Sequence, residues 1–90
     1  MNSITPSAAP IRVERKNTGQ DPRLTIGDNV RKIRRELKLS QEELALEADM
    51  DQAYVSRVES GACNATILII VRLADALNVP PDYLLKATRK

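Results

Sequence analysis

Residues 40–61 read SQEELALEADMDQAYVSRVESG, and this stretch decides the fold. Ser40 and, three positions later, Glu43 form a capping-box pattern, which marks the first turn of a helix. Asp51 can cap a second helix with its carboxylate, and Gly61 is a residue type that often ends one. The two short helices share a turn of about three or four residues, and this spacing predicts a helix-turn-helix motif.

The second of these helices has an outer face of short or hydrogen-bonding side chains. Val55 is expected to point inward, Ala45 lets the two helices cross closely, and Met50 fills the turn. The outer face then consists of Gln52, Ala53, Ser56 and Arg57. Small side chains let a helix approach the major groove of DNA, while an amide and a guanidinium can pair with base edges. This predicts a recognition helix over residues 51–60, although the same residues also suit a plain solvated surface.

Helical spacing continues on both sides of the motif. Before it, apolar residues recur three or four positions apart, at Ile26, Val30, Ile33 and Leu37. This predicts a helix from Leu24 with Thr25 as its N-cap. After the motif, residues 66–77 predict a fourth helix, and Pro81 suits the first turn of a short last helix. Since no strand pattern is present, the sequence predicts an all-α domain of five helices over residues 24–87.

Residues 1–23 have no persistent helical or strand period and contain three of the five prolines. We expect this segment to be a flexible N-terminal arm. Its basic residues suit contact with DNA, as in the arms of some helix-turn-helix domains. Glu14 and Asp21 interrupt the basic run, which favours a solvated tail.

Composition excludes several classes of protein. The 90 residues include one cysteine and no histidine, so neither an intrachain disulfide nor a Cys/His zinc cluster is possible. A Ser-His or Cys-His catalytic pair is equally excluded, and we predict neither an enzyme nor a cofactor. Aromatic residues make up 2%, too few for a protein that stacks single-stranded bases. No apolar run approaches the roughly 20 residues that span a bilayer, and we expect a cytoplasmic protein.

Three stretches together carry a resemblance to a known family. They are LSQEELA at residues 39–45, YVSRVESG at residues 54–61, and ATILIIVRLADALNVPPDYLL at residues 65–85. The sequence resembles the Cro/repressor-type helix-turn-helix proteins, also called the XRE family, and within it restriction-modification controller proteins. The resemblance implies a five-helix, lambda-repressor-like domain. It also implies a transcriptional regulator that binds a double-stranded DNA operator as a homodimer.

The resemblance also implies roles for individual residues. Gln41 matches a glutamine that grips a DNA phosphate and braces the recognition helix, and Gln52 matches a base-reading position. Ala53, Ser56 and Arg57 match the other groove-facing positions. Glu59 matches a glutamate that pairs with an arginine of the first helix, here Arg34, in a structural ion pair. Asn64 matches a phosphate-contacting residue.

Two neighbouring features bear on contact with the DNA backbone. Tyr54 is expected to pack beside the fourth helix with its hydroxyl free to meet phosphate. Between Gly61 and Asn64 the family often has Lys or Arg, whereas this sequence has Ala62 and Cys63. The departure puts the strength of backbone binding in question.

Apolar residues of the fourth helix indicate where a dimer forms. Leu68 and Ile69 point away from the face expected to be set by Ile67, Ile70, Ala74 and Leu77. We expect Leu68, Ile69 and Tyr83 to form the dimer interface, the alternative being that the last helix covers them.

Two other functions fit the same sequence. One is the antitoxin of a toxin–antitoxin pair, with residues 1–23 as the toxin-binding segment. The other is a protein-interaction module that has lost DNA binding, for which Ala62 and Cys63 give weak support.

Overall fold

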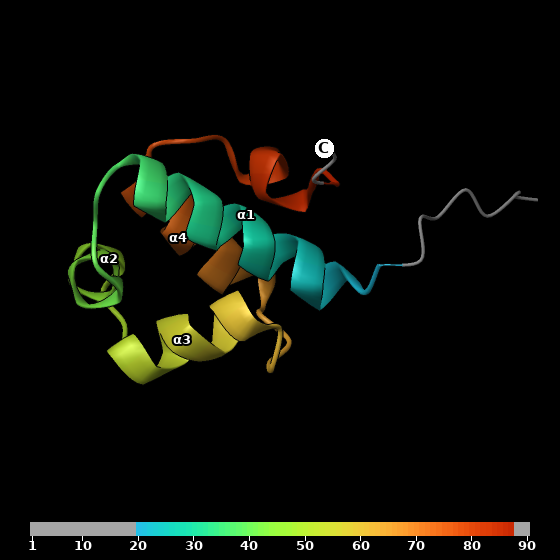
Figure 1. Ribbon diagram of the computed structural model, residues 1–90, viewed down its shortest axis with the longest axis horizontal. Helices are drawn as coiled ribbons and strands as arrows, with labels where there is room; N and C mark the ends of the chain where they lie inside the picture. Colours follow the sequence, from blue (N-terminus) through green and yellow to red (C-terminus); the bar gives the residue numbers. More distant parts are fainter. Residues whose placement is uncertain (1–19, 88–90) are drawn as a thin grey trace, which may run out of the picture.

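The computed structural model describes residues 20–87 and is all-helical over that range (Figure 1). It contains α1 (Pro22–Glu36), α2 (Gln41–Ala48), α3 (Gln52–Ser60) and α4 (Ile67–Leu77). The predicted fifth helix is a short 3-10 helix, η2 (Pro81–Leu85). Within the described part of the chain, none of these helices is long and apolar enough to cross a membrane.

Helix α1 begins earlier than the sequence predicted. Asp21 is its N-cap, and its carboxylate accepts a hydrogen bond from the Arg23 backbone N–H at 2.9 Å. Pro22 follows in the first turn, where a missing N–H removes no helical hydrogen bond. The prediction that Thr25 caps this helix was therefore wrong, because Thr25 lies inside it and is buried. Most of the expected flexible arm, residues 1–23, falls outside the described residues.

The caps of the motif are partly as predicted. The Ser40 hydroxyl accepts from the Glu43 N–H at 2.9 Å, and the Glu43 carboxylate accepts from the Ser40 N–H at 2.8 Å. This confirms the capping box. Asp51 is the N-cap residue of α3, but its side chain makes no capping hydrogen bond, so that part of the prediction was wrong. Gly61 ends α3 at a φ of 78°, the left-handed region that glycine favours.

The core is aliphatic and draws on every helix. Its fully buried large side chains are Val30, Leu44, Val55, Leu73, Leu77 and Leu84. Helix α1 packs against α3, α4 and η2, while α2 packs against α3 and α4. Leu37 was expected on the apolar face of α1, yet it is 47% exposed because it follows the last helical turn as the C-cap.

Gly27 allows α1 to cross the end of α3 with the two backbones in contact. A Cβ atom at this position would lie 2.6 Å from the carbonyl oxygen of Glu59, and closer still to that of Val58. No real Cβ atom approaches a backbone oxygen so closely, so a larger residue would force the helices apart. The crossing fixes α3 on α1, with the outer side of α3 along one edge of the molecule (Figure 1).

Candidate nucleic-acid interface

A three-residue turn joins α2 to α3. Asp49 closes α2 in the left-handed region at a φ of 58°, and the Met50 N–H donates to the Ala45 carbonyl at 3.0 Å. The half-buried Met50 side chain packs against the core. Ala45 and Ala48 are buried between the helices, as the small residues of α2 predicted. The turn thus holds α2 and α3 in a helix-turn-helix arrangement.

The outer face of α3 is open to solvent. Its exposed residues are Gln52, Ala53, Ser56, Arg57 and Ser60. The opposite face is closed by Val55, Val58 and Glu59, all of which are buried. The structure therefore brings the expected groove-facing residues together on a single face of one helix. That face combines small side chains with an amide and a guanidinium, which suits close approach to the edges of DNA bases.

Tyr54 flanks this face and contacts Arg57. The Arg57 guanidinium carbon lies 5.9 Å from the centre of the Tyr54 ring, within the range of a cation–π interaction. Tyr54 is half-buried against the core, and its burial together with the neighbouring Cys63 raises the pKa of its hydroxyl. The raised pKa keeps the hydroxyl protonated and able to donate a hydrogen bond, and its contact with a phosphate stays a prediction.

Glu59 is a buried carboxylate at the back of α3. Its side chain is 1% exposed, and it accepts two hydrogen bonds from Arg34, from Nε at 2.6 Å and from Nη2 at 3.0 Å. Arg34 also donates through Nη1 to the carbonyl of Leu39 at 2.9 Å. The structure therefore places the expected ion pair between α1 and the C-terminal end of α3.

Two further side chains, which sequence reasoning did not assign to this ion pair, also contact Glu59. Gln41, the first residue of α2, donates from Nε2 to Glu59 Oε1 at 3.1 Å. Arg31 donates from Nη2 to the Glu59 backbone carbonyl at 2.9 Å. One signal was available, since Arg31 lies one turn before Arg34 on α1. Glu59 thus connects α1, α2 and α3.

The protonation of Glu59 is set by opposing effects. Burial by itself would raise the pKa of its carboxyl group. The hydrogen bonds from Arg34 and Gln41, together with the charges of Arg34 and Arg31, outweigh burial and hold the pKa below its ordinary value of 4.5. Reciprocally, the hydrogen bond to Glu59 raises the pKa of Arg34. Glu59 is therefore charged at neutral pH.

The loop between α3 and α4 carries the remaining expected phosphate contact. Asn64 is exposed there, whereas Cys63 is partly buried near Tyr54. Ala62 is also exposed and brings no charge to the loop.

The expected dimer residues are distributed unevenly. Leu68 is 62% exposed and Tyr83 44% exposed, while Ile69 is partly buried and packs against the core. Ile67 was expected on the core face but is 79% exposed. That prediction was wrong because the five apolar residues at 67–71 have no helical period, and the buried face proves to be that of Ile70, Leu73, Ala74 and Leu77.

Comparisons with known proteins agree with this geometry. The helix-turn-helix family HTH_3 matches residues 30–84. The control protein C.BamHI of Bacillus amyloliquefaciens is 40% identical over 67 residues, which are 73% of this chain and 83% of that relative.

Solved structures add two close likenesses. The restriction-modification controller protein C.AhdI from Aeromonas hydrophila is 37% identical with a TM-score of 0.67, covering 69% of this chain and 94% of that chain. The biofilm master regulator SinR, solved in complex with DNA, is 29% identical with a TM-score of 0.65, covering 68% of this chain and 98% of that chain.

Proposed function

The chain belongs to the helix-turn-helix family HTH_3, and from this membership we propose that it is a transcriptional regulator that binds a specific double-stranded DNA operator as a homodimer. The observation that carries the proposal is the exposed face of α3, formed by Gln52, Ala53, Ser56 and Arg57. We also propose that the protein acts in the cytoplasm, where it would meet the operator. The family is one of DNA-binding regulators, and we propose no catalytic activity.

We assign base reading to the first turn and middle of α3. Gln52 is the first residue of the helix and is exposed. Its amide offers a donor and an acceptor, the complement of adenine N6 and N7 in the major groove. Ala53 and Ser56 are short enough to let the backbone approach the bases. Arg57 lies further along the same face, where a guanidinium reads guanine or binds a phosphate.

We assign contacts with the DNA backbone to Gln41 and Asn64. Gln41 begins α2, and a helix N-terminus attracts anions through its free backbone N–H groups. One hydrogen bond of the Gln41 amide goes to Glu59, which leaves its second N–H able to donate to a phosphate oxygen. Tyr54 contributes mainly by its contact with Arg57. This arrangement couples the phosphate contact of α2 to the position of α3.

A second copy of the chain is the natural occupant of the apolar surface on α4 and η2. We define this C-terminal apolar surface by Ile67, Leu68, Tyr83 and Leu85, which are 79%, 62%, 44% and 54% exposed. One recognition helix reads a few base pairs, and useful affinity requires a second half-site, as dimeric helix-turn-helix proteins provide. Ile69, which the sequence suggested for this interface, contributes less because it is partly buried.

Selection of bound sequences from random duplex DNA tests the proposal. We expect enrichment of a palindrome whose half-sites are centred about one helical turn, 10–10.5 base pairs, or a multiple of it apart. A pool that stays random after several rounds would contradict sequence-specific binding and would favour a protein-interaction module. Co-purification with a small neighbour-encoded protein would instead support an antitoxin.

A further inference from the structure

Asn29 is a buried polar residue on the side of α1 that faces η2. Its side chain amide donates from Nδ2 to the Leu84 carbonyl at 2.8 Å and to the Lys86 carbonyl at 2.8 Å. Asn29 is 7% exposed. An amide nitrogen has two N–H groups, and both are used here on the carbonyls that flank Leu85. Asn29 therefore ties the C-terminal segment to α1 through two backbone carbonyls that lie two residues apart.

The conformation of η2, the segment that Asn29 holds, depends on its contacts with the other helices. η2 is a 3-10 helix of five residues, and such helices have poorer hydrogen-bond geometry than α-helices and are short. Leu84 is fully buried, while its neighbours Tyr83 and Leu85 are exposed. The Lys86 ammonium lies 5.6 Å from the Tyr83 ring and adds an exposed contact within the segment. The positions of Tyr83 and Leu85 thus follow from the attachment of Leu84 and of the two carbonyls.

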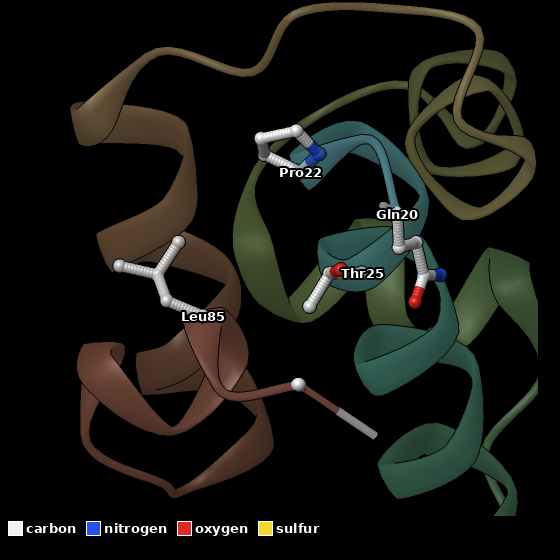
Figure 2. Close-up of a pocket in the computed structure, with 5 residues that line it drawn as sticks. Gln20, Pro22, Thr25 and Leu85 are labelled. Atoms are coloured by element: carbon white, nitrogen blue, oxygen red, sulfur yellow. The ribbon is translucent and has the colours of Figure 1, made fainter. Parts of the chain in front are cut away.

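One turn before Asn29 on α1, the side chains of α1 and of the C-terminal segment leave a pocket between them. Figure 2 shows a pocket there, lined by Gln20, Pro22, Thr25, Leu85 and Ala87. Thr25 lies four residues before Asn29, so the two side chains share a face of α1. Because Leu85 and Thr25 stand on opposite sides of a pocket, the seam between α1 and η2 is loosely filled at this level. The hydrogen bonds that hold η2 to α1 therefore come from Asn29, while buried Leu84 and the packing of η2 on α4 supply the apolar part of the attachment.

We propose that Asn29 is a positioning residue for dimerisation, which holds η2 so that Tyr83 and Leu85 form one surface with Ile67 and Leu68 for a second copy. The proposal rests on the proposed homodimer. It separates Asn29 from the DNA-reading elements, because α3 packs on α1 and α2 and is tied to them through Glu59. A change at Asn29 should therefore weaken the dimer and leave the helix-turn-helix motif intact.

The test uses the full chain with the substitution Asn29→Leu, which keeps the branching and the number of side-chain heavy atoms and deletes both donors, and Asn29→Ser as a smaller polar alternative. Sedimentation equilibrium gives the dimer dissociation constant, and amide NMR signals of residues 41–60 report on the motif. We expect dimerisation to weaken by about tenfold or more, the effect of losing two buried hydrogen bonds, with those signals unchanged.

Two controls separate positioning from general stability. Thr25→Val, on the same face of α1, removes a hydroxyl that makes no hydrogen bond to residues 81–87, the described part of the C-terminal segment, and we expect an unchanged dimer. Val55→Ala lowers stability from within α3, away from η2, and we expect lower thermal stability with an unchanged dissociation constant.

Each result decides between the proposals. A folded Asn29 variant that dimerises within twofold of wild type would overturn the positioning role and leave the homodimer standing. Equal weakening by Val55→Ala, or unfolding of both Asn29 variants, would also overturn it, since Asn29 would then be a residue of the general fold. A wild-type chain that stays monomeric would refute the homodimer itself, and the role of Asn29 with it.

Discussion

Replacing Glu59 with alanine should destabilise the protein more than any substitution of an exposed glutamate. The Glu59 carboxylate accepts hydrogen bonds from Arg34 at 2.6 and 3.0 Å and from Gln41 at 3.1 Å, and its side chain is 1% exposed. Its removal leaves the Arg34 guanidinium, whose side chain is 11% exposed, without a counter-charge. Breaking a buried ion pair from one side costs about 3–5 kcal/mol. For a domain of this size, that loss corresponds to a fall in Tm of at least about 12 °C.

Thermal unfolding followed by far-UV circular dichroism at neutral pH measures this loss. Glu47→Ala is the matched control, because Glu47 is exposed on α2, and its Tm should stay within about 2 °C of wild type. A Tm of Glu59→Ala equally close to wild type would refute the reasoning, because the carboxylate would then contribute no net stability.

Acidification provides a second measurement on the same group. The folded-state pKa of Glu59 lies below its ordinary value of 4.5. Its stabilising contribution is therefore fully present above pH 4.5 and is lost as the pH falls through the folded-state pKa. Glu59→Gln should consequently lose less stability on acidification than wild type does, measured by urea unfolding at a series of pH values. Parallel pH profiles for the two proteins would show that Glu59 does not contribute to the acid response.

Three other substitutions test the fold, the reading face and the dimer. Gln52→Ala should weaken operator binding by about 1–3 kcal/mol and leave binding to scrambled duplex nearly unchanged, measured by titration of both duplexes at several salt concentrations; an intact operator-to-scrambled ratio would remove Gln52 from the reading face. Leu68→Glu should yield a soluble monomer with weak operator binding, and a variant that still sediments as a dimer would remove Leu68 from the interface. Gly27→Ala should lower the Tm by several degrees, since its Cβ would lie 2.6 Å from the Glu59 carbonyl oxygen. An unchanged Tm would contradict this prediction, because α1 and α3 would then move apart with no loss in the free energy of unfolding.

Local patterns predicted the motif well because its determinants are local. The capping box of Ser40 and Glu43 spans one helical turn, and the glycine at position 61 needs no distant partner to end α3. The outer face of α3 follows from the same 3.6-residue period that buries Val55 and Val58. The pairing of Arg34 with Glu59 came from the resemblance to a family, because no local period relates residues 25 positions apart.

The features that were missed depend on tertiary context. The prolines of residues 1–23 indicated irregular chain, but Pro22 lies in the first turn of α1, where a proline is compatible with a helix. The start of α4 was predicted correctly, but Ile67 was assigned to the wrong face because consecutive apolar residues give no preferred face. Asn29 did carry a signal, since it interrupts the apolar stripe of Ile26, Val30 and Ile33. A buried amide must find hydrogen-bond partners, yet the sequence does not show that these are Leu84 and Lys86.

Helix α1 is the element through which the reading face and the dimer surface are related in space. Gly27, Arg31 and Arg34 recur four and three residues apart, and all three meet the C-terminal end of α3. Asn29 lies between them in sequence but contacts η2. The close approach at Gly27 and the hydrogen bonds from Arg31, Arg34 and Asn29 therefore attach α3 and η2 to the same helix. In the proposed dimer, the separation of the two recognition helices is then set by the fixed distance across α1, and this rigidity would make operator affinity depend steeply on the spacing of the half-sites.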